Sequence, residues 1–464
     1  MNEHIHEALN EISDKHIAEA ATKKKRKRTI VLRIAAAAAA LAVIIGVFQL
    51  PRPIMAQAVS LADDCRIPER PDRDDYKNMD EWRAALNAWD KQDKVRTETT
   101  KAALAGLQDF FTKANTKFLS GTDNAVWSPT NAYISLSMVA ELTEGSSRQQ
   151  ILDLLGTENT DALRTQVSAV WESTYEEGFE ACSLANSLWL QKGLSYNQET
   201  MDALSYHYYA DVYQTNLKKA GGAIGAWLNN NTGGLLKRST GSIRLPENAV
   251  LALYSTLYFQ SKWSSQFRAT NNKQDIFHAP SGDTTVTYMT KKLAMMDYYY
   301  GDCFSAVRMG LQNGSQMWFI LPDEGYDPAA VLEDGQYMEM LLDTEWENVK
   351  NMKVNLSVPK FDVSDKQDLA GGLKEMGVTD VFDQNASDFS AITSDTPIFL
   401  TAANQAVRVE IDEEGVKAAA YIEFHGATSP MPPDEIIDFV LDRPFLFVIT
   451  NNRVPMFAGV VNEP

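Results

Sequence analysis

The sequence predicts a single α+β domain, built around one large sheet, over residues 103–464. Two features of that stretch predict it: helical patterns come first, and short β-rich runs follow them in mixed order. No further linker of consequence interrupts this texture before the C-terminus. The 464-residue chain is 44% hydrophobic and 10% aromatic, so it can bury a large core.

The predicted helices lie at the start of the domain. ALAGLQDFFTKANTKFL, from about residue 103, has helical periodicity. SPTNAYISLSMVAELTEGSSRQQILDLLG, from Ser128, begins with the serine and proline of a helix start and continues with apolar residues at spacings of three and four.

Strands are expected in later runs that are rich in β-branched and aromatic residues. Several of these runs are apolar throughout, which is typical of strands buried on both faces of a sheet. The runs are LANSLWLQ, VLALYSTLYFQ, FSAVRMG, MWFILP, VNLSVPKF, AVRVEI, DFVL and FLFVIT.

The N-terminal region carries a membrane signal. Residues 1–28 form a polar segment that ends in KKKRKR, and residues 29–50 are largely apolar, interrupted by Arg33 and Gln49. About 20 apolar residues span a bilayer, and a basic cluster before them stays in the cytoplasm. We therefore predict a retained transmembrane helix or signal anchor, single-pass in the cell membrane, with the rest of the chain extracellular. Small residues around Gln57 leave open cleavage near Ala58 and secretion. A buried core helix is the remaining alternative, but its polybasic flank would then have no purpose.

Residues 51–102 are predicted to form a charged spacer. The stretch is rich in Arg, Asp, Glu and Lys, contains PERPDRDD, and becomes helical near EWRAALNAWDKQ. Such a spacer would hold the domain away from the membrane.

Charge and cysteine content argue against other classes of protein. The formal net charge of −19 disfavours a nucleic acid partner, because phosphate binding needs clustered Lys and Arg. Cys65, Cys182 and Cys303 form no CxxC pair and can make at most one disulfide. The simplest expectation is two buried thiols and one exposed thiol.

The sequence contains no recognisable catalytic or cofactor motif. His207, His278 and His425, which follow the membrane segment, have no HExxH or other metal-ligand spacing. The GxSxG elbow and the glycine-rich phosphate loops are also absent. We expect no bound metal, no cofactor and no enzyme activity.

Several segments follow one another in the order and spacing found in serpins. They are SPTNAYISLSMVAELTEGSSRQQI, ANSLWLQKG, YYADVYQTNL, NNTGGLLK, YSTLYFQSKWSSQF, VPKFDVSDKQDLAGGLKEMGVTDVFD, IDEEGVKAAA and FVLDRPFLFVITNNRVPMFAGVVNEP. The FVLDRPFLFVI segment, with Asp442, Arg443, Pro444 and Phe445, is a specific signature of that family. From about residue 103 to its C-terminus, the chain resembles the serpins, a family of serine protease inhibitors.

The resemblance implies a fold of three β-sheets and eight or nine helices with an exposed reactive-centre loop. In the family a serine protease attacks that loop, forms an acyl-enzyme and is trapped in a 1:1 covalent complex as the loop inserts into the main sheet. It thus implies a monomeric inhibitor of serine proteases, with cysteine proteases as a further class. Together with the membrane segment, this describes an inhibitor displayed on a bacterial surface. The alternative is a non-inhibitory serpin that acts as a binding, carrier or structural surface protein.

The residues of the expected loop hinge have the pattern of a strand. Every second residue from Val416 to Phe424 is apolar, and the residues between them can face solvent, which separates the two sets only in a strand. Small alanines ease entry between packed strands, and Gly415 supplies conformational freedom for a swivel. An ordinary helix is the alternative, but its apolar residues would recur every three or four positions. The hinge comprises Glu413, Glu414, Gly415, Val416, Lys417, Ala418, Ala419 and Ala420.

The resemblance also implies a gate in the main sheet, formed by Ser128, Ser255, Gln405 and Trp263. Gln405 stands where the family commonly has a histidine, and Ser255 where an asparagine is expected. A contact between their amide and hydroxyl groups could replace the usual pair. Trp263 matches the tryptophan at the top of the opening sheet, although plain core packing would also explain it. The hinge departs from the family as well, since Val416 takes the place of a Thr or Ser.

The scissile bond is predicted to within a few residues. Counting forward from Gly415 at family spacing leads to Ser429, and counting back from Pro444 leads to Pro433, so this loop is longer than the common form. No Arg or Lys occurs between Lys417 and Arg443, so elastase-like or subtilisin-like targets are favoured over trypsin-like ones. The candidates beside the cut are Ala427, Thr428, Ser429, Pro430 and Met431.

Overall fold

The computed structural model describes residues 59–60, 71, 73–174, 182–232, 243–342, 346–416 and 435–464, all within one compact unit, Gln57–Pro464. The predicted cytoplasmic segment, the predicted membrane helix and the cleavage site near Ala58 lie outside these residues. Within them, no helix combines the length and the apolar character needed to cross a membrane.

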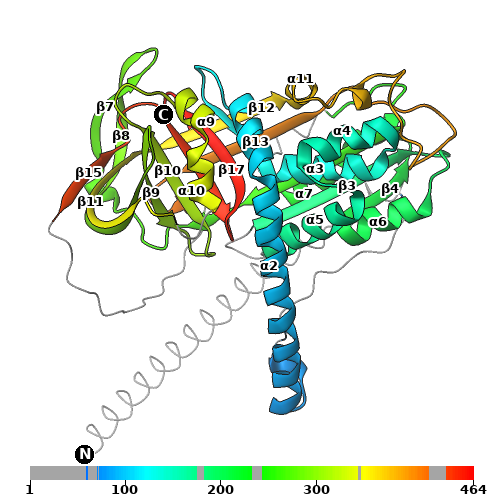
Figure 1. Cartoon of the computed structure of the whole chain (residues 1–464), viewed down its shortest axis with the longest axis horizontal. Helices are drawn as coiled ribbons and strands as arrows, with labels where there is room; N and C mark the ends of the chain where they lie inside the picture. The colour runs from blue at the N-terminus through cyan, green and yellow to red at the C-terminus, as the bar shows by residue number, and fades with distance from the viewer. Residues whose placement is uncertain are drawn as a thin grey trace, which may run out of the picture. The chain divides into compact units, whose positions relative to one another are not determined.

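The α-helices gather in two groups around the sheets (Figure 1). Helices α3, α5, α6 and α7 lie beside strands β3 to β5, with α4 against α3, whereas α9 lies beside β10 and α10 packs against α9 and α2. The described helices are α2 (Met79–Phe118), α3 (Pro129–Leu142), α4 (Gly145–Leu155), α5 (Thr160–Thr174), α6 (Gln198–Tyr208), α7 (Gly221–Asn231), α9 (Pro328–Asp334), α10 (Gln336–Leu342) and α11 (Leu369–Glu375), with 3₁₀ turns at Arg73–Asp75, Leu217–Lys219, Ala269–Asn271 and Asp380–Phe382.

The described strands form three hydrogen-bonded groups, here called the first, second and third sheets, and together with the helices they confirm the α+β class predicted from the sequence. The first sheet has the order β1 (Val59–Ser60), β4 (Ala210–Thr215), β3 (Cys182–Gln191), β5 (Leu251–Phe259). The second has the order β12 (Phe361–Asp368), β13 (Asn404–Ile411), β14 (Gly415–Val416), β6 (Ser261–Lys262). The third has the order β15 (Ile436–Val440), β11 (Val349–Pro359), β8 (Gly282–Tyr300), β9 (Phe304–Gly310), β10 (Gln316–Pro322), β16 (Phe445–Asn451), β17 (Val454–Val461), β2 (Ala125–Trp127), and β7 (Lys273–Ala279) pairs with β8.

The first two sheets are the halves of one main sheet. A single residue, Gln260, separates the end of β5 from the start of β6, so one chain segment passes from the first half into the second. At the end marked by β6, the short strand β14 bridges to β13. Away from β14, no pairing joins β5 to β13 among the described strands. The main sheet is therefore closed at one end and parted along the rest of these two strands.

Helix α2 runs across residue 102, where the sequence predicted that the spacer would meet the domain. Asn78 caps the start of the helix, because its side chain accepts hydrogen bonds from the amides of Asp80 and Glu81. Its first half is largely exposed, and burial begins near Thr100. One continuous helix thus joins the charged stretch to the domain core.

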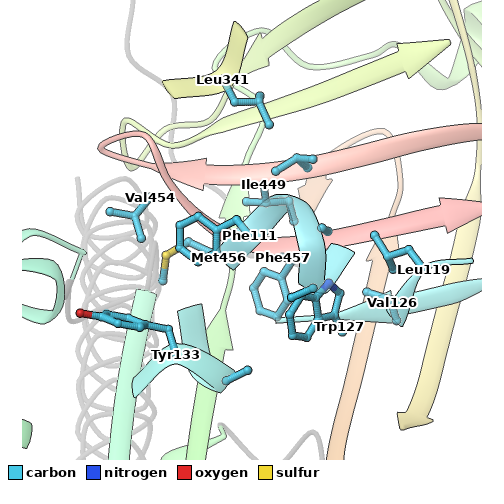
Figure 2. Close-up of a cluster of buried hydrophobic side chains, with 14 of the residues drawn as sticks. Phe111, Leu119, Val126, Trp127, Tyr133, Leu341, Ile449, Val454, Met456 and Phe457 are labelled. Atoms are coloured by element: carbon cyan, nitrogen blue, oxygen red, sulfur yellow. The ribbon is translucent and has the colours of Figure 1, made fainter. Parts of the chain in front are cut away.

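The core around α2 holds the third sheet against the helices. Figure 2 shows Phe111 of α2 close to Met456 and Phe457 of β17, with Trp127 of β2 beside them. All four side chains are at most 5% exposed. The indole of Trp127 donates to Asn115 Oδ1 at 2.8 Å, so its polar atom is satisfied in this apolar setting. This packing fixes the part of the third sheet on which the main sheet lies.

Candidate functional site

The chain reverses direction directly after β13. Asp412 makes the turn: its Oδ1 accepts hydrogen bonds from the amides of Glu414 at 2.8 Å and Gly415 at 3.2 Å. Its own amide donates to the Gly415 carbonyl at 3.1 Å. An aspartate that bonds the backbone two residues ahead is a common turn former. The turn aims the chain back between the halves of the main sheet.

Gly415 and Val416 are seated in the main sheet as β14. Gly415 pairs with Lys262 and Val416 with Ser261, while Val416 also pairs with Ile411 of β13. Val416 is 4% exposed. A Cβ on Gly415 would lie 2.4 Å from Lys262 Cα and 2.4 Å from the Ser261 carbonyl oxygen. The close approach of two backbones therefore requires glycine here, whereas the sequence had suggested a need for conformational freedom.

Glu413 fastens the turn to the neighbouring elements. Its carboxylate pairs with Lys360 Nζ at 2.6 Å and accepts a hydrogen bond from Asn272 Nδ2. Its carbonyl accepts from the Phe267 amide at 3.2 Å. Burial would raise the pKa of Glu413, but the hydrogen bonds from Lys360 and Asn272 outweigh it and the pKa is lowered.

Trp263 supports the turn from below. Its side chain is fully buried, and its Nε1 donates to the Asp412 carbonyl at 2.8 Å. Its amide donates to the Glu414 carbonyl at 3.0 Å. The ring also packs edge-on against Phe267, with centroids 5.9 Å apart. Trp263 is therefore packed in the core and also bonded to the turn that precedes β14.

A small pocket, which we name the slot, lies below Val416 between the two halves of the main sheet. Its walls come from β5 and β13 and its floor from β16 and β17, so it continues the path on which β14 starts. The lining residues are Leu257, Phe259, Arg408, Val409, Glu410, Val416, Ile449 and Phe457. Most of them are apolar, so the slot suits apolar side chains that follow Val416 at every second position.

Three of the four predicted gate residues, Ser128, Gln405 and Ser255, belong to one hydrogen-bond relay that crosses the parted strands, although Gln405 and Ser255 do not make the direct contact that was expected. The Gln405 side chain accepts from the Ser128 amide at 2.8 Å and donates to the Ser128 carbonyl at 3.0 Å. It also donates to Asn131 Oδ1 at 3.3 Å. Asn131 Nδ2 donates to Ser255 Oγ at 2.7 Å, and that hydroxyl donates to Asn186 Oδ1 at 2.6 Å. Gln405 of β13 and Ser255 of β5 are thus joined through Asn131.

Sequence reasoning missed Asn131 and Asn186. Both are at least 93% buried, and Asn186 also donates to the Tyr208 carbonyl at 2.7 Å. A buried polar side chain needs partners, so an asparagine inside the apolar run LANSLWLQ was the available signal. Asn131 gave a weaker signal, because asparagine is ordinary at the start of a helix.

The signature residues hold the connection between β15 and β16. Arg443 donates from Nη2 to the Pro322 carbonyl at 2.8 Å and from Nη1 to Asp442 Oδ1 at 3.0 Å. Phe445 is fully buried among the rings of Phe277, Phe319 and Phe361. Their role is therefore packing of the third sheet. Pro444 lies between them in the same connection.

Several predicted residues lie outside the described part of the chain. These are the hinge residues Lys417, Ala418, Ala419 and Ala420 and all the scissile-bond candidates, 427–431. Cys65 also lies outside it, whereas Cys182 and Cys303 are buried. Among the described residues, no cluster of three or more His, Cys, Asp or Glu side chains is placed to hold a metal ion.

Comparisons with known proteins place this geometry in a family. A family model described as "Serpin (serine protease inhibitor)" matches residues 107–464. Alpha-1-antiproteinase of Callosciurus caniceps is 26% identical over 357 residues, covering 74% of this chain and 84% of that protein. Neuroserpin of Mus musculus is 28% identical over 368 residues, covering 74% and 86%.

Solved structures agree on the fold. The native state of tengpin, a thermophilic serpin, matches with a TM-score of 0.68 and 20% identity, covering 78% of this chain and 94% of that one. Thyroxine-binding globulin in complex with thyroxine matches with a TM-score of 0.64 and 21% identity, covering 78% and 98%. The fold and the family model agree on one class of protein. The chain belongs to the serpin family.

Proposed function

We propose that this chain is a suicide-substrate inhibitor of serine proteases that traps the acyl-enzyme by inserting its cleaved loop into the main sheet. The observation that carries the proposal is the position of β14. Gly415 and Val416 already occupy the top of the path between β6 and β13, directly above the apolar slot. Ala418 and Ala420, which follow Val416 at every second position of the sequence, are small and apolar and match the slot in chemistry.

The gate supplies the second argument for insertion. The strands that must part, β5 and β13, are held together by side chains rather than by a strand ladder, because Asn131 bonds both Gln405 and Ser255. A net hydrogen bond contributes about 0.5–1.5 kcal/mol, so exchange of a few such bonds for a full strand ladder favours insertion. Cleavage of the loop would release the strand that makes this exchange possible.

The proposed targets are elastase-like or subtilisin-like proteases. The support is the sequence between Lys417 and Arg443, which offers small residues and Met431 but no Arg or Lys for a trypsin-like pocket. Cysteine proteases form a further class, because they too pass through an acyl-enzyme.

We also propose that the inhibitor is displayed on a bacterial surface by its N-terminal apolar segment, with secretion after cleavage near Ala58 as the alternative. Helix α2 supports the spacer role. Its exposed first half, from Met79 to about Thr100, would extend about 30 Å at 1.5 Å per residue. Protease accessibility of tagged termini in intact cells tests the topology. A C-terminal tag that resists external protease would contradict it.

Two measurements test inhibition. The full-length protein is incubated with elastase-, subtilisin- and trypsin-like enzymes, and complexes that survive denaturing gels are sought and mapped by mass spectrometry. The expected result is a 1:1 covalent complex with one of the first two enzymes. Separately, nicking of the loop should raise the melting temperature sharply, because the released strand inserts. A nicked protein of unchanged stability, with all enzymes still active, would favour the binding or carrier alternative.

A further inference from the structure

The exposed face of the third sheet carries a group of apolar side chains at β8, β11 and β15. Leu293 is 54% exposed, Met295 43% and Ile436 54%. Strand register places Met295 opposite Lys353, and Lys353 opposite Ile436. Met295, Lys353 and Ile436 therefore lie in one row across adjacent strands. Neighbouring strands are about 4.8 Å apart, which puts Met295 and Ile436 about 10 Å apart. We name Leu293, Met295, Lys353 and Ile436 the β8–β15 patch.

Leu293 occupies a backbone conformation that leucine disfavours. Its φ is +52°, in the left-handed region, at a register shift between β8 and β11. Asn355 holds the irregularity in place: its Oδ1 accepts from the Leu293 amide at 3.0 Å, and its Nδ2 donates to Asp438 of β15 at 2.8 Å. The bulge on β8 is thus fixed by Asn355 of β11, which is held in turn by Asp438 of β15.

Folding alone does not account for this leucine. The side chain gains little from burial because it is half exposed, and glycine or asparagine would fit its backbone with less strain. Backbone strain in an exposed apolar residue, next to further exposed apolar residues, is typical of a binding surface. The patch therefore needs an occupant.

The chain connectivity indicates which occupant. Strand β15 begins at Ile436, and the scissile-bond candidates at 427–431 precede it by five to nine residues. That length of chain spans at most about 17–30 Å at about 3.3 Å per residue. A protease domain of about 200 residues has a radius of gyration of about 16 Å, so an enzyme engaged at the loop reaches the face that β15 borders.

We propose that the β8–β15 patch binds the body of the target protease, on the side of the enzyme that accommodates the residues after the cleaved bond. This inference rests on the proposed function, because it extends the contact made by the loop. The patch calls for an enzyme surface that is apolar, with a carboxylate placed to meet Lys353. Such a contact would act on formation of the initial complex and leave loop insertion unaffected.

The test uses the double variant Leu293→Asn and Met295→Ser in the full-length protein. Asparagine tolerates the left-handed conformation, so the variant should fold without loss of melting temperature. Ile276→Thr is the matched control, because Ile276 is 47% exposed on β7, away from the patch. Affinity is measured for elastase and subtilisin whose catalytic serine is replaced by alanine, and the rate of covalent complex formation for the active enzymes. A peptide of residues 412–435 serves as a substrate without the patch.

We expect the double variant to bind about tenfold more weakly, equivalent to about 1.4 kcal/mol, and to form complex about tenfold more slowly. The stoichiometry of inhibition should not change, and the control should match wild type. Complex formation at the wild-type rate by the double variant would overturn the patch while leaving inhibition intact. A wild-type dimer in sedimentation that the variant lacks would assign the patch to a second copy and also overturn it. Failure of wild type to trap any enzyme would refute the proposed function itself.

Discussion

Replacing Gly415 with alanine tests the seating of the hinge in the main sheet. The new Cβ would lie 2.4 Å from Lys262 Cα and from the Ser261 carbonyl oxygen, and backbone atoms in a paired strand cannot retreat as a flexible side chain can. We expect β14 to separate from β6. The loss is bounded by burial of Val416, about 1.5–3 kcal/mol, plus roughly two strand hydrogen bonds at about 1 kcal/mol each. The seated state should therefore lose about 3–5 kcal/mol.

The assay for this variant combines thermal melting at a fixed scan rate with the stoichiometry of protease inhibition. A loss of that size should lower the melting temperature by about 5 °C for a domain of this length. More inhibitor should be consumed as a cleaved substrate while the protease is released active. The reason is that the added Cβ would also clash when the cleaved strand inserts. Gly371→Ala in α11 is the control, since its Cβ would meet nothing within 4 Å. A Gly415→Ala protein that melts and inhibits like wild type would refute the close packing inferred for the hinge.

Three further changes probe the gate and the turn. Gln405→Leu removes the partner of the Ser128 amide and one of the two partners of the Ser128 carbonyl, so we expect a loss of about 2–3 kcal/mol, measured as a lower melting temperature. Gln405→Glu, which keeps an acceptor for the Ser128 amide, is the comparison. Glu413→Gln should destabilise the protein by about 1 kcal/mol at pH 7. Because the pKa of Glu413 is lowered in the folded state, its contribution to stability is present above its unfolded pKa and is lost as the pH falls through the folded pKa. The melting curves of variant and wild type should therefore converge in acid. Trp263→Phe removes the donor to the Asp412 carbonyl and should make the turn more sensitive to limited proteolysis, whereas unchanged sensitivity would contradict support by the indole.

Much of the fold follows from local patterns in the sequence. Each run predicted as a strand overlaps a strand of the structure, because these runs are apolar or alternating over their whole length. The start predicted at Ser128 is also confirmed: its side chain accepts from the Asn131 amide at 3.2 Å. The longest of the described strands, β8, was missed, because Thr, Lys and Tyr along it interrupt any simple apolar period.

The gate shows why some of the site could be anticipated and the rest could not. Resemblance pointed to Ser128, Ser255 and Gln405, but it could not supply the route between them. Ser128 and Gln405 are 277 residues apart in the chain, and Asn131 and Ser255 are 124 apart. Pairings of this kind depend on which strands become neighbours, and no local period encodes that.

By itself, the sequence determined the family, the α+β class and the alternating apolar positions that follow Gly415, because periodicity and motif order are properties of the chain. Tertiary structure alone decided that Gly415 must be glycine, since the reason is the backbone of Lys262 rather than a local turn. It also decided that Leu293 is exposed in a left-handed conformation, since a register shift against β11 places it there. In both cases the constraint comes from atoms that are remote in the chain and meet only when the sheets assemble.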